Sequence, residues 1–269
     1  MNPVLPTRSV AKPWGRDALP APFAAPQGER IGEIWFEPPA ELPQLLIKYI
    51  FTSEALSVQV HPSDAQAEAR GLGRQGKEEC WLVIDAEPGA VLGIGFNAPV
   101  DAAVLRAAAL DGSIEQLMTW HPVAAGDFFY IPAGTVHAIG AGVSLIEVQQ
   151  NSEITYRLYD YGRPRELHLD EGLAVARGEV YEAQWHRRVE PRSEVTLVDG
   201  PLFRLDRIDG PPSDLLRPFY AGAPLLVIPR EVGVVVGGVE LAVGECALAR
   251  DIDEVAVEGG ALALLAKAL

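Results

Sequence analysis

The chain has 269 residues, 48% of them hydrophobic, and a formal net charge of −15 at pH 7. This length and apolar content are enough for one or two domains with full cores, and they exclude an intrinsically disordered chain. The negative charge argues against a nucleic-acid partner, which needs a basic face, whereas a few lysines and arginines in a cleft can still bind an anionic small molecule.

Cysteine usage and apolar patterning indicate the compartment. Cys80 and Cys246 are the only cysteines, and two thiols so far apart imply no disulfide framework, which fits a reducing cytoplasm. The N-terminus lacks a basic region followed by an apolar run, and no apolar stretch reaches the ~18 residues needed to cross a bilayer. We therefore expect a cytoplasmic protein without a membrane partner; no pattern predicts an oligomeric state.

The first part of the chain combines an irregular start with a pair of strands. Residues 1–30 are rich in proline and alanine and are expected to wrap the surface with little regular structure. Residues 45–51 and 55–61 have the pattern of consecutive strands separated by a polar turn. Ser63 and Gln66 form a capping-box pattern, which predicts a short helix that ends at the next glycines.

The middle of the chain alternates short strands with short helices. Apolar runs bounded by glycine and proline predict strands at residues 80–85, 91–96, 128–131, 144–149 and 155–159. Helical patterns are found at residues 98–110, after a cap at Ser113, and at residues 167–177. His121 precedes one of the strands and is expected to be a solvated loop histidine. So many short strands with turns between them predict an all-β sandwich or jelly-roll barrel with a few short helices.

After residue 180 the strand pattern resumes. Strands are predicted at residues 195–198, 203–208, 225–228, 232–236, 240–243, 247–250 and 261–266. The segment 122–127 is echoed by 240–245, which predicts a second, degenerate copy of the first β unit. We expect a catalytic unit at residues 1–178 and a second β unit at residues 179–269. His186 is the only histidine after residue 170, so the second unit lacks a histidine site and is expected to be structural.

One strand and the turn after it position a histidine. The strand ends at Ile131, Pro132 then sets φ, and Gly134 permits a positive φ, so the chain reverses and His137 is expected at the rim of the next strand. A single histidine beside an apolar strand is more often a hydrogen-bonded core residue than a metal ligand. The residues upstream favour the interpretation of His137 as a metal ligand.

Alternate residues of two earlier strands present polar faces. On the first strand these residues are Ser57, Gln59 and His61. On the second they are Lys77, Glu79 and Trp81. Two imidazoles, one carboxylate and one amide oxygen could therefore converge, from Gln59, His61, Glu79 and His137. This mixed set suits zinc or another divalent transition ion and leaves room for water or substrate.

The spacing Gly126-x5-Pro132-x-Gly134-x2-His137 resembles the second motif of the cupin superfamily. Longer blocks go further, because residues 57–62, 76–81 and 149–160 resemble, in order, type I mannose-6-phosphate isomerases of the short bacterial form. The resemblance covers about residues 10–170 and thins after residue 180. It implies two cupin-type jelly-roll β units, the second of them degenerate.

The resemblance also implies a role for each polar residue. The metal ligands of the family correspond to Gln59, His61, Glu79 and His137, which would hold one divalent ion, with zinc expected. Glu78 is the alternative carboxylate, and Glu79 is preferred because it directly precedes Cys-Trp in the family pattern. The catalytic positions correspond to Lys77, Arg157 and Glu153, the last in place of the family's usual Asp. Substrate contacts are expected from Ser57, Lys77 and Arg157, and the phosphate has four candidates, Arg157, Lys77, Arg163 and Lys48.

The function implied by the resemblance is isomerisation of mannose 6-phosphate and fructose 6-phosphate. A proton would move between C1 and C2 through an enediol while a divalent ion holds the two oxygens. Two alternatives remain open on the residues. One is an Fe(II) cupin oxygenase with His61, Glu79 and His137 as a facial triad. The other is a non-catalytic regulatory cupin that binds a sugar phosphate.

Overall fold

The computed structural model describes residues 2–269, and its regular structure is mainly antiparallel β-sheet with a few short helices. This confirms the all-β fold class. The largest sheet has seven strands in the order β1-β2-β3-β10-β5-β8-β12. In chain order they are β1 (Thr7–Arg16), β2 (Ile31–Phe36), β3 (Leu45–Phe51), β5 (Glu79–Ala86), β8 (Asp127–Ile131), β10 (Val143–Gln150) and β12 (His186–Arg188).

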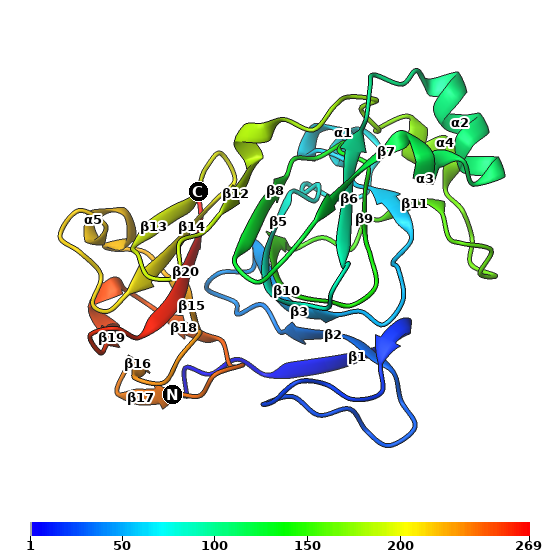
Figure 1. Ribbon diagram of the computed structural model, residues 1–269. Coiled ribbons are helices and arrows are strands. Elements are labelled where there is room, and N and C mark those ends of the chain that lie inside the picture. Colours follow the sequence, from blue (N-terminus) through cyan, green and yellow to red (C-terminus); the bar gives the residue numbers. More distant parts are fainter. Residues whose placement is uncertain (1) are drawn as a thin grey trace.

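A five-stranded sheet faces the first one and closes a barrel (Figure 1). Its order is β11-β4-β9-β6-β7. The strands are β4 (Val58–Val60), β6 (Val91–Phe96), β7 (Met118–Pro122), β9 (His137–Ile139) and β11 (Tyr156–Tyr159). Apolar side chains from both sheets fill one end of the space between them, including Ile50, Trp81, Ile94 and Leu145. Buried polar and charged side chains, among them Lys48, Glu79 and Glu147, occupy the other end.

The C-terminal unit is a second, smaller pair of antiparallel sheets, drawn yellow to red beside the barrel (Figure 1). One sheet has the order β13-β14-β20-β15-β18 and the other β17-β16-β19. The strands are β13 (Val195–Asp199), β14 (Phe203–Asp209), β15 (Leu225–Pro229), β16 (Val234–Val236), β17 (Val239–Leu241), β18 (Ala247–Ala249), β19 (Val255–Val257) and β20 (Leu262–Ala268). All seven strands predicted after residue 180 are present, and β12 and β19 were missed.

The two units share one apolar core. Outward-facing residues of the seven-stranded sheet, such as Tyr49 and Ile146, belong to the same buried cluster as Phe203 and Leu264 of the C-terminal unit. This explains why β3 and β10 are buried along their whole length, because one face lines the barrel and the other is covered by the second unit. The predicted division between residues 178 and 179 stays a prediction.

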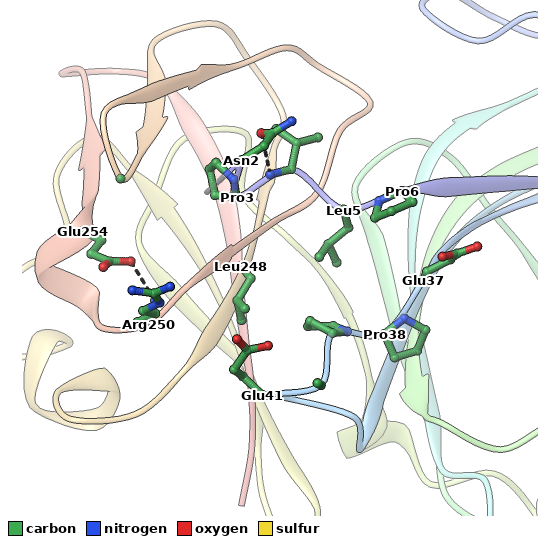
Figure 2. Close-up of a pocket in the computed structure, with 14 residues that line it drawn as sticks. Asn2, Pro3, Leu5, Pro6, Glu37, Pro38, Glu41, Leu248, Arg250 and Glu254 are labelled. Atoms are coloured by element: carbon green, nitrogen blue, oxygen red, sulfur yellow. Dashed lines mark hydrogen bonds between the residues drawn. The ribbon is translucent and has the colours of Figure 1, made fainter.

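The expectation of little regular structure in residues 1–30 holds for residues 17–30 but was wrong for residues 7–16. Thr7–Arg16 form a ten-residue strand that pairs with β2. Before it, Val4 pairs with Ala247 of β18, and the Leu5 amide donates to the carbonyl of Cys246 at 2.8 Å. Figure 2 shows Asn2–Pro6 beside a cleft between the two units, opposite Leu248 and Glu41. Proline and alanine content concealed this strand, which pairs with β2, and also the segment before it, which pairs with a unit more than 200 residues away in sequence.

The helices are short and lie mainly on the five-stranded side of the barrel (Figure 1). They are α1 (Asp64–Ala69), α2 (Ala102–Asp111), α3 (Ile114–Leu117), α4 (Leu169–Leu173) and α5 (Arg217–Tyr220), with 3-10 turns at Ala183–Trp185 and Ile252–Glu254. The predicted capping box of α1 is present. Ser113 stands at the predicted N-cap position of α3, but its side chain accepts no hydrogen bond from the helix, and its hydroxyl donates instead to Asp111 Oδ1 at 2.6 Å. The patterns at 98–110 and 167–177 overestimated α2 and α4, the former because Asp101 caps the helix from outside.

Both cysteines are free and buried. Within residues 2–269 none of the helices combines the length and the apolar character that a membrane crossing requires.

Candidate active site

The turn between β8 and β9 has the predicted geometry. Gly134 has φ +84°, and a Cβ added there would lie 2.9 Å from the Val175 carbonyl oxygen. The Gly134 amide donates to the carbonyl of His61 at 2.8 Å. The turn is therefore tied to the end of β4, and it delivers His137 as the first residue of β9, directly opposite Gln59 of β4.

Three predicted metal ligands meet in the barrel interior. The candidate ligand atoms of His61, Glu79 and His137 all lie within 4.8 Å of one another, and all three residues are buried. Glu79 Oε1 is 3.3 Å from His137 Nε2, and Glu79 Oε2 is 3.6 Å from His61 Nε2. The structure brings Glu79 to the histidines, whereas Glu78 lies on the other face of the strand and accepts a hydrogen bond from the Tyr130 hydroxyl.

The donor chemistry of this cluster fits a divalent cation. His61 Nδ1 lies 2.8 Å from the Ile154 carbonyl and His137 Nδ1 lies 2.9 Å from the Thr135 carbonyl. These contacts place the proton on Nδ1 and leave Nε2 unprotonated, with a lone pair that can bind a metal, as in many metal-binding histidines. Glu79 Oε1 is buried without a hydrogen-bond donor, and a buried carboxylate oxygen of this kind is costly unless a cation binds it.

Electrostatics keep both imidazoles neutral. Burial, together with the nearby Lys77 ammonium group, lowers the pKa of His61 well below its usual value and that of His137 to about 4. Neutral imidazole is the form that binds metals. Burial and the neighbouring Glu147 carboxylate raise the pKa of Glu79 to about 7, which is the expected effect of a low-dielectric site on an anion that has no metal partner.

Gln59 is the fourth predicted ligand, and it lies against the cluster. Its side-chain nitrogen is 3.3 Å from His137 Nε2. A rotation of the amide by half a turn would present the oxygen to the same place, and the choice between the two amide orientations follows from the hydrogen-bond network. The role of Gln59 as a ligand therefore stays a prediction.

A cavity of about 280 Å³ opens beside Gln59 at the polar end of the barrel. Its acidic and basic lining residues are Lys12, Glu33, Lys48, Lys77, Glu147, Glu153, Arg157 and Arg165. The remaining lining residues include Trp14, Trp35, Ser57 and Thr155. A concave site this rich in charge is suited to a small, highly hydroxylated anion.

Lys77 is the lysine nearest the cluster. It is buried, and its Nζ lies 2.5 Å from Glu79 Oε2 and 3.1 Å from His61 Nε2. Burial by itself would lower the pKa of Lys77, but the Glu79 and Glu147 carboxylates raise it. The ammonium group of Lys77 is therefore held inside the protein, beside His61 and Glu79 and not at an exposed rim.

Arg157 also lines the cavity, as predicted. Its Nη1 donates to the Glu166 carbonyl at 2.7 Å, and its Nε is buried without a partner. Burial and the neighbouring Arg165 guanidinium lower the pKa of Arg157. An arginine with an unused buried donor is poised to bind negative charge in the cavity.

The other predicted residues lie in different environments. Ser57 lines the cavity, with Oγ 3.5 Å from Gln59 Oε1. Glu153 lines it too but is exposed at its mouth. Of the four phosphate candidates, Arg163 does not line the cavity, because it pairs with Asp160 and Glu54.

Glu147 is the main residue that the sequence analysis missed. This carboxylate on β10 accepts hydrogen bonds from Lys48 Nζ and Trp81 Nε1, both at 3.0 Å. Burial would raise the pKa of Glu147, but Lys48 and Lys77 together lower it to about 2. The signal in the sequence was a single acidic residue inside the apolar run Leu145–Val148. A charged side chain in a buried strand is rare unless it is paired, so its presence indicates a buried partner of opposite charge.

The prediction for His121 was wrong. It lies on β7, half-buried, with its ring 5.7 Å from Phe129 and 5.8 Å from Tyr181. Its position just before a predicted strand suggested a connecting loop, but the segment is itself an edge strand that pairs with β6. His121 is not among the residues of the metal-binding cluster.

Comparison with known proteins supports the resemblance seen in the motifs. No family model matches the chain. The mannose-6-phosphate isomerase ManA of Bacillus subtilis is 38% identical over 172 residues, which cover 61% of this chain and 54% of that protein. The mannose-6-phosphate isomerase of Streptococcus mutans is 44% identical over 137 residues, covering 49% and 43%. The chain spans about half the length of the curated relatives it matches.

The likeness in fold extends over the whole chain. The crystal structure of the mannose 6-phosphate isomerase from Bacillus subtilis superimposes with a TM-score of 0.78 at 23% identity, covering 99% of each chain. The part beyond residue 180, where no sequence motif was recognised, is therefore included in the shared fold.

Proposed function

We propose that this chain is a metal-dependent mannose-6-phosphate isomerase, an aldose–ketose isomerase that interconverts mannose 6-phosphate and fructose 6-phosphate. The observation that carries the proposal is the buried set of His61, Glu79 and His137, which Lys77 and Gln59 join to the cavity that they and Arg157 line. The names of the relatives support the same activity. The substrate partner is a small sugar phosphate.

One divalent ion, for which we propose zinc, would be held by His61, Glu79 and His137 with Gln59 as the fourth ligand. When bound, it would polarise the sugar carbonyl and stabilise the negative charge that develops on O1 and O2. The donor set of two imidazoles and one carboxylate suits such an ion and leaves positions for substrate.

The residues around the cavity would divide the remaining work. Lys77 and Glu153 are proposed for proton transfer between C1 and C2, and Lys77 also contacts substrate from inside the cavity. Arg157 would donate hydrogen bonds to oxygens that become negative in the transition state. Ser57 would bind a sugar hydroxyl. The C-terminal unit, residues 179–269, is proposed to be structural, and the two buried free thiols fit a cytoplasmic location.

A coupled assay with mannose 6-phosphate and added zinc, manganese or cobalt tests this function. We expect turnover that chelation abolishes and metal restores, with one ion bound per chain by elemental analysis. Binding of the sugar phosphate without turnover under every metal would favour a regulatory protein, and oxygen consumption with bound iron would favour an oxygenase. Active protein without any metal would contradict the proposed centre.

A further inference from the structure

Four of the five basic side chains that line the cavity are already neutralised by carboxylates. The ion pairs are Lys12–Glu33 at 3.3 Å, Lys48–Glu147 at 3.0 Å, Lys77–Glu79 at 2.5 Å and Arg165–Asp160 at 2.5 Å. The fifth, Arg157, is engaged only with a backbone carbonyl. A phosphate dianion therefore finds few uncompensated positive charges inside the cavity, in a chain whose net charge is −15.

A smaller hollow of about 120 Å³ adjoins the cavity, and Trp35 and Glu153 line both. Arg8 contributes the basic group of this outer hollow. Glu37 and Pro38 line it as well, and the same two residues line the cleft between the units that is shown in Figure 2. The outer hollow thus lies between the solvent-facing cleft and the cavity.

Trp35 links the cations of the two spaces. The Arg8 guanidinium carbon is 4.5 Å from the centroid of the Trp35 ring, and Lys48 Nζ is 4.4 Å from the same centroid. The two cations are therefore separated by no more than the sum of these distances. The indole N–H donates to Glu33 Oε2 at 2.5 Å, which fixes the plane of the ring.

Arg8 is free to bind an anion. It is exposed, and within residues 2–269 no carboxylate lies within ion-pair distance of it and no hydrogen bond engages its guanidinium. Stacking on an aromatic face uses the plane of the guanidinium and leaves its N–H edge available for bidentate binding of an oxyanion. Glu37 and Glu153 line the hollow but do not occupy these donors.

We propose that Arg8, stacked on Trp35, binds the phosphate group of the sugar phosphate at the mouth of the cavity and so selects phosphorylated over unphosphorylated sugars. This inference rests on the proposed function. The reacting carbons would lie in the inner cavity, which both Lys77 and Glu153 line, while the phosphate stays beside Arg8 in the outer hollow. Arg8 is then a substrate-binding residue that acts in both the ground state and the transition state.

Calorimetric titration of the metal-loaded protein with fructose 6-phosphate, fructose and inorganic phosphate tests the role of Arg8. We expect Arg8→Gln to weaken the binding of fructose 6-phosphate and of inorganic phosphate about tenfold, since one charge-assisted bidentate contact is lost. The binding of fructose should be unchanged. Arg8→Lys should lose about threefold, because an ammonium group keeps the charge but not the planar fork. The control for loss of one positive charge is Arg217→Gln, at a partly exposed arginine on α5 of the C-terminal unit whose guanidinium pairs with Asp253.

Kinetics distinguish this inference from the proposed function. Arg8→Gln should raise KM for the phosphorylated sugar and keep kcat, because uniform binding is lost. Unchanged affinity and KM in an active enzyme would overturn the Arg8 site alone, as would equal weakening of fructose and fructose 6-phosphate. A wild-type protein that binds neither the sugar phosphate nor inorganic phosphate would overturn both. A protein that binds phosphate through Arg8 but never isomerises the sugar would overturn only the proposed function.

Discussion

At the scale of single residues, the site consists of charges that are buried because each has a partner. Lys48, Lys77, Glu79 and Glu147 are all less than a tenth exposed, and the two lysines pair with the two glutamates at 3.0 and 2.5 Å. Removing one member of such a pair is strongly destabilising, since the other is left as an uncompensated buried charge. Arg157 differs from them because no carboxylate of the cavity neutralises it, and it is the residue on which we base the catalytic test.

Arg157→Ala should lower kcat about 10²–10³-fold while it leaves metal content unchanged, because the arginine acts on charge that develops in the transition state. Binding of mannose 6-phosphate should change by less than about tenfold. Arg157→Lys should recover little activity, since an ammonium group cannot reproduce the planar pair of N–H donors of the guanidinium group. Steady-state kinetics with metal analysis measure this. Unchanged kcat with a large rise in KM would make Arg157 a substrate anchor instead.

Glu147 should make the stability of the metal-free protein depend on acid pH. Burial opposes its ionisation, but Lys48 and Lys77 lower its folded pKa to about 2 from the ordinary 4.5. The folded state thus favours the ionised form, so the stabilisation is present above pH 4.5 and is lost as pH falls toward 2. The expected loss is about 2–3 kcal/mol over that window.

Urea unfolding between pH 5.5 and pH 3.5 measures this dependence. The free energy of unfolding of the wild type should fall more steeply with decreasing pH than that of Glu147→Gln, which has nearly the same shape but does not titrate. Parallel pH profiles for the two proteins would show that Glu147 is not ionised in the folded state.

At the scale of elements, the turn between β8 and β9 links backbone conformation to the metal ligands. Gly134 has a positive φ, its amide donates to the His61 carbonyl, and three residues later the chain presents His137. The turn also pairs through Thr135 with Arg177, just beyond α4. A change of backbone here therefore moves two ligands together.

Gly134→Ala should destabilise the fold by about 1–3 kcal/mol and weaken metal binding, because the new Cβ meets the Val175 carbonyl at 2.9 Å in a conformation that L-residues disfavour. Gly89→Ala is the matched control, since Gly89 has the same φ of +84° with nothing within 4 Å of the added Cβ. The control should pay only the conformational cost and keep its metal affinity. Equal metal affinity in the two variants would show that the conformation of this turn does not control metal binding.

At the scale of the whole molecule, the two units are held together by a shared apolar core and by backbone pairing between the N-terminal residues and the C-terminal unit. The C-terminal sheet covers the outer face of β3, β5 and β10, whose inner face carries Lys48, Glu79 and Glu147. The N-terminal residues Pro3–Leu5 in turn pair with β18 of the C-terminal unit. The proposed metal ligands thus belong to the first unit, while the strands that carry them depend on the second for burial.

Truncation after residue 178 should give aggregated protein, although every proposed catalytic residue is retained. It would expose the apolar outer face of the seven-stranded sheet, including Ile47, Tyr49 and Ile146, and it would remove the partner of the N-terminal edge. Light scattering and size-exclusion chromatography of the truncated chain measure this. A monodisperse, fully active fragment would show that the units fold and function independently.

The amino-acid sequence by itself determined the elements and residues whose physics is local. The turn at Pro132–Gly134, the capping box at Ser63, and the alternation that puts His61 and Glu79 on inward faces all follow from neighbours in the chain, and each was predicted. Tertiary structure decided what depends on distant partners. The charge of Glu147 is tolerated because Lys48 lies on the adjacent strand. Strand β1 forms because it pairs with β2, and the residues just before β1 are held by pairing with β18. Arg8 and Trp35 meet for the same reason, since strand pairing, and not sequence spacing, sets which side chains share a face.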